Sequence, residues 1–294
     1  MRRPLAMTAS LLIVLAACGS AADTDPFALF TTQWRDDPIW NDGKAEYCLY
    51  DATRTIYGKP RHYQARLFTN KELADPVTKT KSADNRGRVA FKHHMRDDIS
   101  TENYSYHYST MCYVGVTDLK SLKLDMGAQE DCGTSFKQYV NHAGQCDWRQ
   151  STYFPKEGFR SGTYRPSRDF VFQDALSLVL RGFPFEDPPR SLALKMLADQ
   201  TTNRWTVSSA TPVTIRYLGR ETLDLPVGTV EAYRLRVSTT GKGSTGAAIS
   251  HEYWFSASGQ PPWLHVMVQY TGPNGISYKL REHKRWAYWK RPPR

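Results

Sequence analysis

The sequence predicts a mainly β fold in which one large curved antiparallel sheet, a half-barrel-like meander, wraps one amphipathic helix. Three observations support this prediction. Aromatic and β-branched residues alternate with polar ones over many strand-length segments. Runs rich in Gly, Pro and Asn separate these segments and are typical of turns. Apolar residues recur at helical spacing in one segment, residues 167–182.

The N-terminus predicts export and a lipid anchor. Arg2 and Arg3 precede a short apolar run, which ends in two alanines directly before Cys18. A membrane span needs about 20 apolar residues, so this shorter run is predicted to be a signal peptide over residues 1–17. Cys18 is the predicted lipidation site, and several acyl chains hold a protein on a membrane where one chain holds it only marginally. Residues 18–30 are predicted to be the lipidated tether.

The remainder, residues 31–294, is long enough for a single β-rich domain, with sub-halves 31–165 and 166–294 as an alternative division. The clearest strand covers residues 104–116. There Tyr106, Tyr108, Cys112 and Val114 share one face, while polar side chains occupy much of the other. Consecutive strands joined by short turns predict an antiparallel meander.

A single helix is predicted over residues 167–182. Phe172, Leu176, Val179 and Phe183 lie on one face at helical spacing, and Gly182 suits the C-terminal turn. An apolar helix in a β-rich chain usually packs on the concave face of the sheet and completes the core. The alternative is that these four residues line an apolar cleft that takes an acyl chain.

The C-terminal half continues with predicted strands around residues 213–217, 233–237, 249–255 and 264–270, separated by turns such as the one at Gly219. The last segment, residues 284–294, interleaves basic and aromatic side chains. Such a pattern is typical of a surface that contacts glycans or lipid headgroups. We favour the simpler interpretation of a final edge strand with a charged, proline-ended tail.

Four cysteines remain after Cys18. Cys132 and Cys146 bracket a segment of hairpin length, which favours a Cys132–Cys146 disulfide and leaves Cys48–Cys112 as the second pair. A loop of this size would stabilise the protein by about 3 kcal/mol. Buried free thiols are the alternative, because free cysteine is a common core residue.

Catalytic and metal motifs are weak. His93 and His94 are adjacent on a predicted strand and would point to opposite faces, so a shared metal is not expected. Cys132, with His142 as a base, is the one candidate for a thiol-dependent enzyme. Since Cys146 offers a disulfide instead, we expect no catalytic residue, no metal and no cofactor.

The charge balance is basic, with 39 Lys and Arg residues against 29 Asp and Glu residues. Two of those basic residues belong to the predicted signal. In an exported protein a moderate basic excess indicates a surface close to anionic envelope material, and the chain has no recognisable nucleic-acid motif. We therefore expect a membrane partner, through the anchor, and no nucleic-acid partner.

From residue 167 onward the chain resembles an uncharacterised family of Gram-negative envelope proteins that share a domain of unknown function. The resemblance rests on the helix ending at Phe183-Pro184, the strand-turn-strand segment 217–229, and the late strand 253–255 with the following Pro262 to His265. It implies a fold like the curved sheet and helix of lipoprotein carriers. The family has no known activity and so implies no catalytic residue.

These features together predict a non-enzymatic, lipid-anchored cell-envelope lipoprotein that binds an apolar or amphiphilic envelope component. Gly19, rather than Asp, follows Cys18, which favours the outer membrane with the protein facing the periplasm. The alternative function is a structural or scaffolding lipoprotein without a ligand.

Changing Cys18 to Ser tests the anchor. The variant should take up no labelled acyl chain and should remain an unprocessed precursor, because the hydroxyl cannot replace the thiol that is lipidated. Metabolic labelling with palmitate and membrane fractionation measure this, with Cys132→Ser as a control that keeps its label. A Cys18→Ser protein that is still matured and membrane-bound would show that the anchor lies elsewhere.

Overall fold

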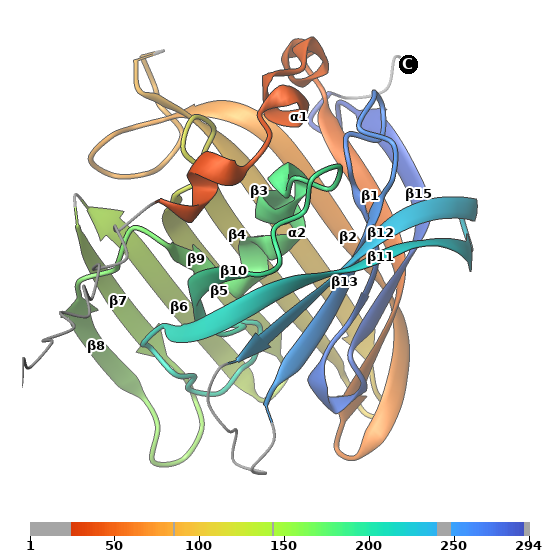
Figure 1. Cartoon of the computed structure of the whole chain (residues 1–294). Coiled ribbons are helices and arrows are strands. Elements are labelled where there is room, and N and C mark those ends of the chain that lie inside the picture. The colour runs from red at the N-terminus through yellow and green to blue at the C-terminus, as the bar shows by residue number, and fades with distance from the viewer. Residues whose placement is uncertain (1–24, 85, 143, 240–247, 291–294) are drawn as a thin grey trace, which may run out of the picture.

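The computed structural model describes residues 25–84, 86–142, 144–239 and 248–290. The described residues form one 15-stranded sheet that curves around a short helical segment (Figure 1). The predicted fold class is therefore confirmed. Cys18 lies outside the described residues.

The strands are β1 (Ala45–Ile56), β2 (Lys59–Ala74), β3 (Arg88–Ser100), β4 (Ser105–Gly115), β5 (Ser121–Glu130), β6 (Gly133–His142), β7 (Gln145–Ser151), β8 (Phe159–Tyr164), β9 (Phe170–Phe172), β10 (Leu192–Leu197), β11 (Thr211–Leu225), β12 (Gly228–Thr239), β13 (Ser250–Ser256), β14 (Met267–Thr271) and β15 (Ser277–Trp286). The helical segments are η1 (Pro26–Leu29), α1 (Gln33–Asp36), η2 (Pro38–Asn41), η3 (Gln173–Ala175), α2 (Leu176–Val179), η4 (Leu180–Gly182) and η5 (Pro273–Gly275).

The strand order is that of two meanders joined in the middle. It runs from β8 down to β1, continues with β15, and then runs from β14 down to β9. All neighbouring strands are antiparallel except β9 and β10, which are parallel. Since β1 pairs with β15, the two sequence halves share one sheet and one main core.

Period-two alternation sets the concave face, as the sequence predicts. In β4, Tyr106, Tyr108, Thr110, Cys112 and Val114 are all buried in the interior or at its margin. Figure 1 shows α2 inside the curve of the sheet, with the N-terminal helical segments across one end. The helical segment therefore fills the concave side and completes the core.

The helix is shorter than predicted. It covers η3, α2 and η4, residues 173–182, whereas residues 170–172 form strand β9 beside β10. The reason is that Phe172 has an extended backbone (φ −78°, ψ 133°) and belongs to the ladder, so helical hydrogen bonding starts only after it. The polar residues Ser177 and Arg181 are buried too, with exposures of 7% and 0%. The amphipathic pattern therefore belongs to a helical segment that is buried on both sides, with one apolar face and one polar face.

Over the residues that the structure describes, the sheet does not close on itself. Its β9 edge instead turns inward and lies against β5, where the backbone N–H of Phe172 donates to the Ser121 hydroxyl (3.1 Å). The β8 edge is on the outer turn, and the Tyr164 and Phe170 rings meet at 5.8 Å between their centroids. The sheet is thus rolled up with overlapping edges.

The predicted tether ends earlier than residue 30. Phe27 and Phe30 are both only 5% exposed, and the Phe30 ring contacts Phe183. The backbone N–H of Thr31 also donates to the Gly182 carbonyl (2.7 Å). Because these aromatic rings gain by burial, residues 25–30 belong to the folded domain.

The predicted disulfides are wrong, since Cys48, Cys112, Cys132 and Cys146 are all free thiols. Cys132 precedes β6 and Cys146 pairs with Asn141 near the far end of that strand, so the two cysteines lie about 30 Å apart at ~3.3 Å per residue. Cys48 and Cys112 are three strands apart, on β1 and β4, or about 14 Å at ~4.8 Å per strand. A disulfide needs Cα atoms within about 7 Å.

Two smaller predictions are also corrected. Gly219 is not a turn, because β11 continues through it with a register shift, and the turn lies after Leu225. The C-terminal strand β15 is not an edge, since it lies between β1 and β14 in the middle of the sheet. Its aromatic residue Trp286 packs on the outer face against Tyr47 and Phe68.

Truncating Leu176 tests the central position of the helix. The side chain is fully buried, so Leu176→Ala should lower the free energy of unfolding by about 2–5 kcal/mol through lost apolar burial and a cavity. Urea denaturation measures the change. The exposed Leu218 offers a matched control, whose change to Ala should have an effect of about 0.5 kcal/mol or less. Equal effects of the two substitutions would contradict a packed helix.

Candidate functional site

A cavity of about 620 Å³ lies at one end of the rolled sheet, where the start of the helical segment meets the loop after β10. Its wall is mainly apolar, with a few polar groups. The lining residues are Arg54, Thr55, Gln173, Met196, Ala198, Asp199, Val207, Ser209, Thr211, Pro212, Thr239, Ile249, His251, Tyr270, Pro273, Asn274 and Ile276. A smaller cavity of about 70 Å³ shares four of these residues and reaches deeper, to Ser177 and Met267. Cavities of this size and lining are typical of small-molecule sites.

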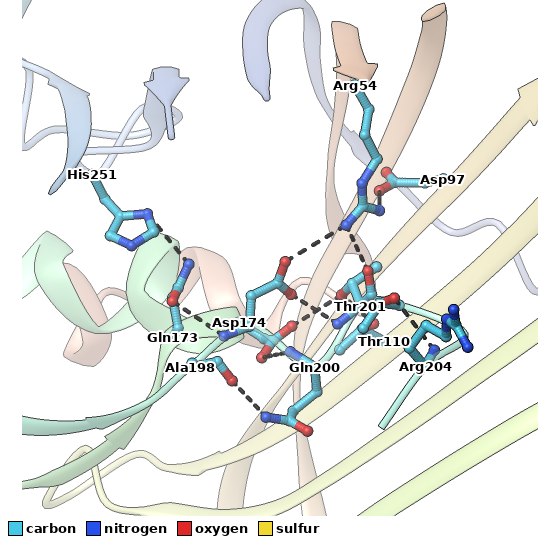
Figure 2. Close-up of polar contacts among 12 residues, drawn as sticks. Arg54, Asp97, Thr110, Gln173, Asp174, Ala198, Gln200, Thr201, Arg204 and His251 are labelled. Atoms are coloured by element: carbon cyan, nitrogen blue, oxygen red, sulfur yellow. Dashed lines mark hydrogen bonds and ion pairs between the residues drawn. The ribbon is translucent and has the colours of Figure 1, made fainter. Parts of the chain in front are cut away.

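Hydrogen bonds between the loop after β10 and the start of the helical segment shape the inner wall of the larger cavity. The backbone N–H of Asp199 donates to Gln173 Oε1 (3.1 Å), and that of Gln200 donates to Asp174 Oδ2 (3.2 Å). The Thr201 hydroxyl donates to the other oxygen of Asp174 (3.0 Å). Figure 2 shows this network, with Arg54 and Asp97 reaching it from the sheet.

Arg54 is the central cation of the site. It extends from β1, and its Nη2 donates to the Thr201 carbonyl (2.6 Å) and lies 3.7 Å from Asp199 Oδ2. Its Nη1 is 3.9 Å from Asp97 Oδ2. Two carboxylates, those of Asp97 and Asp199, therefore lie within 4 Å of one guanidinium, and the Asp174 carboxyl is linked to this group through Thr201.

Burial and mutual repulsion change the pKa of each carboxyl differently. Burial raises the pKa of Asp97 to about 6, against the attraction of Arg54. Burial and the neighbouring charge of Asp199 hold the pKa of Asp174 well above its usual value. For Asp199 burial acts in the same direction, but Arg54 and a hydrogen bond from Asp174 outweigh it, so its pKa is lowered. Asp174 is thus the less acidic member of the pair and Asp199 the more acidic one.

Two basic side chains complete the surroundings. Lys137 is fully buried and its Nζ donates to the Gln200 carbonyl (2.9 Å), while burial lowers its pKa to about 7. His251 is 4% exposed and lines the larger cavity. Its Nδ1 contacts the Tyr270 hydroxyl (2.9 Å) and Gln173 Nε2 (3.4 Å), and burial lowers its pKa.

A second polar cluster lies deeper, at the other end of the helical segment. Arg181 donates to both oxygens of Glu46 (3.0 and 2.5 Å), and His283 Nε2 lies 3.5 Å from the same carboxylate. Glu46, Cys48 and His283 present potential metal ligands within 4.8 Å of one another. The guanidinium already occupies the carboxylate and would repel a metal cation there, so this cluster is a buried ion pair.

The structure separates the predicted cleft residues from the observed cavities. Phe172, Leu176, Val179 and Phe183 are at most 1% exposed, and none of them lines either cavity. They face the apolar core, because the opposite face of the same helical segment borders the open space. The apolar cleft as predicted is therefore wrong, and the cavity lies on the polar side of the helix, at Gln173, Asp174 and Ser177.

The two histidines follow the alternation predicted for a strand. His93 points inward and contacts Thr69 (2.8 Å) and Ser177 (2.7 Å), whereas His94 lies on the outer face beside Ser109. They cannot share a metal.

The thiol-enzyme alternative is not assembled. Cys132 and His142 are at opposite ends of β6, about 30 Å apart at ~3.3 Å per residue. A general base must reach its nucleophile directly or through one water.

Sequence reasoning missed Arg54, Asp97, Asp174 and Asp199. A signal for two of them was present in the strand alternation. In β1, Arg54 lies at every second residue from the buried Tyr50 and Ala52 and so points to the same face. Asp97 likewise points to the face of the buried residues of β3. A charged residue at a strand position that faces the core predicts a buried polar site. Asp174 lies in η3 and Asp199 in the loop after β10, so neither has a strand pattern to mark it.

Comparison with one solved structure supports the fold. A solved β-barrel-like protein of the domain of unknown function DUF1849, from Brucella abortus, has a TM-score of 0.50 at 7% identity and covers 83% of this chain and 98% of its own. A Bacteroides fragilis protein with a YmcC-like fold has a TM-score of 0.27 at 9% identity, covering 82% and 96%. No curated protein matches the chain. Residues 141–281 match the family model of a protein of unknown function, DUF3108, which confirms the predicted resemblance to an uncharacterised family.

The raised pKa of Asp97 predicts a pH-dependent stability. Between its unfolded value near 3.8 and its folded value of about 6, the folded protein binds more protons than the unfolded chain, so this residue lowers stability as the pH rises through that window. The loss approaches about 3 kcal/mol. Urea denaturation from pH 4 to 7 should therefore show wild type losing stability relative to Asp97→Asn. The exposed Asp224→Asn serves as the control and should follow wild type; equal pH slopes for wild type and Asp97→Asn would contradict the prediction.

Proposed function

We propose that this chain, which carries a DUF3108 domain over residues 141–281, is a lipid-anchored cell-envelope protein that binds an amphiphile in the cavity beside Arg54. The cavity itself is the observation that carries the proposal. Only Arg54 and Thr55 among its lining residues lie outside the matched segment. The cavity is therefore built almost wholly by the family domain.

The composition of the wall supports an amphiphile over a purely polar ligand. Ile249 and Val207 line the cavity and are 42% and 59% exposed, although both are large apolar side chains. Burying them would be favourable at about 25 cal/mol per Å². Further in, Arg54, Gln173 and His251 supply polar contacts. An elongated ligand with one apolar and one polar part satisfies both regions.

The anchor supplies the setting for this function. Cys18 is proposed to carry the acyl chains and to hold the protein on the outer membrane, facing the periplasm. Within the described residues, no helix is long and apolar enough to cross a membrane. A protein held at a bilayer surface has a high local concentration of amphiphiles, which favours occupancy of an apolar cavity.

A structural, ligand-free role is the second candidate. This structural role is favoured by the burial of Leu176 and Val179, which the sequence placed in an apolar cleft. Both side chains are fully buried and fill the core. The two roles differ in whether the cavity beside Arg54 is ever occupied. Catalysis is not part of the proposal.

Filling the cavity tests the proposal. Ala198 lines it, so Ala198→Trp should occupy the space and lower the amount of copurifying amphiphile at least several-fold, with the fold retained. Native mass spectrometry and lipid extraction of the full-length protein measure the bound molecule. Ala193→Trp is the matched control, because Ala193 is exposed on strand β10 and does not line the cavity.

Wild-type protein that carries no amphiphile, from cells or after incubation with lipid extract, would leave the structural role in its place. An Ala198→Trp protein that retains the full amount of ligand would place the binding site elsewhere.

A further inference from the structure

The outer face of the sheet carries a cluster of aromatic side chains at the end of β15. Its members contact one another through their rings and take no part in the apolar core. This aromatic patch consists of Tyr47, Phe68, Trp286, Tyr288 and Trp289. Ring centroids lie 4.6 Å apart for Phe68 and Tyr288, and 5.3 Å apart for Tyr47 and Trp286. Side chains from β1, β2 and the C-terminal segment therefore form one surface.

Three of these rings are open to solvent. Tyr47 and Phe68 are buried beneath the others, whereas Trp286, Tyr288 and Trp289 are 44%, 36% and 50% exposed. Because β15 lies in the middle of the sheet, the exposed rings protect no strand edge. A cluster of large apolar side chains left exposed indicates a surface that contacts a partner.

Basic side chains accompany the aromatic patch. Lys284 Nζ lies 5.2 Å from the ring centroids of both Tyr47 and Trp286, and 2.8 residues' worth of screening is not available from its one acidic contact, Glu282, at 2.7 Å. Over residues 284–294 the sequence has five Lys and Arg residues and no Asp or Glu. Tyr and Trp rings with Lys and Arg side chains are typical of protein surfaces at the level of lipid headgroups, and the positive charge favours anionic lipid.

The N-terminal segment places this end of the sheet near the proposed anchor. Arg285 Nη2 donates to the Ile39 carbonyl (3.0 Å) and to Asp42 (2.8 Å), so the end of β15 lies against η2. Figure 1 shows α1 across the same end. Cys18 precedes Asp25, the first described residue, by seven residues, which span at most about 25 Å. Acyl chains on Cys18 would therefore hold this end close to the bilayer.

We propose that the aromatic patch, with Lys284 and Lys290, rests on an anionic lipid surface and so fixes the orientation of the anchored protein on the membrane. The inference rests on the anchor of the proposed function and does not depend on the amphiphile. The cavity lies elsewhere, because Tyr47 is near the start of β1 and Thr55, which lines the cavity, is about 26 Å away at ~3.3 Å per residue.

Brominated lipids test the contact, because bromine quenches tryptophan fluorescence only at close range. Lipidated full-length protein is reconstituted into vesicles of brominated phosphatidylglycerol and phosphatidylcholine. Trp286 and Trp289 are the exposed tryptophans of the described residues, so changing both to Phe should lower the quenching at least about twofold. Trp205→Phe is the control, since Trp205 lies beside β8, where its Nε1 donates to the Gly158 carbonyl, and its loss should leave the quenching unchanged.

A charge variant keeps both tryptophans. Lys284→Glu with Lys290→Glu should lower the quenching to the level that wild type shows on vesicles of brominated phosphatidylcholine alone, because attraction to the anionic surface is lost. Vesicle-bound wild type whose quenching is unaffected by the two Phe substitutions would overturn the docking surface and leave the anchor standing. Equal quenching on anionic and neutral vesicles would overturn the preference for anionic lipid. Unquenched protein that instead binds peptidoglycan through these tryptophans would assign the patch to a glycan and overturn the inference.

Discussion

The ion pair of Glu46 and Arg181 holds the helical segment in its place inside the rolled sheet. Both side chains are at most 1% exposed, and the guanidinium contacts both carboxylate oxygens. Removing one partner of such a pair leaves an uncompensated buried charge and typically costs about 3–5 kcal/mol. The pair fixes the end of the helical segment against β1, and the contact of Ser177 with His93 fixes its middle against β3. The start of the segment is thereby held beside Arg54.

A helix with two interior faces explains why a cavity coexists with a filled core. The apolar face of the helical segment is fully packed in the core. The polar face is directed toward the sheet, where its side chains form individual hydrogen bonds and an ion pair. Where the helical segment begins, Gln173 and Asp174 bond to the loop after β10, and beyond them no side chain of the described residues fills the space. The cavity therefore begins where the polar face of the helical segment reaches solvent, and apolar residues at the strand ends form its other walls.

The sequence carried the fold class and the inner face of most strands, because alternation is local. It placed Tyr106, Tyr108 and Cys112 together correctly, and it put His93 and His94 on opposite faces. It could not place Cys48 relative to Cys112, since that depends on register across three strand pairs. The sequence could not predict the site for a related reason. Asp174 and Asp199 lie close together because β9, directly before the helical segment, pairs in parallel with β10. The signal for the site that the sequence did contain was a charged residue at an inward-facing strand position, as at Arg54 and Glu46.

The overlapping edges of the sheet have a mechanical consequence. A closed barrel has its radius fixed by the number of strands and their stagger, because every edge is joined by backbone hydrogen bonds. Here the inner edge meets β5 through the Phe172 to Ser121 contact, and the outer edge meets it through the rings of Tyr164 and Phe170. Sliding this overlap breaks side-chain contacts and leaves the strand ladder intact. A change in the circumference of the roll would therefore break these contacts, and the hydrogen bonds from β6 and β7 to the loop after β10, but no strand pairing.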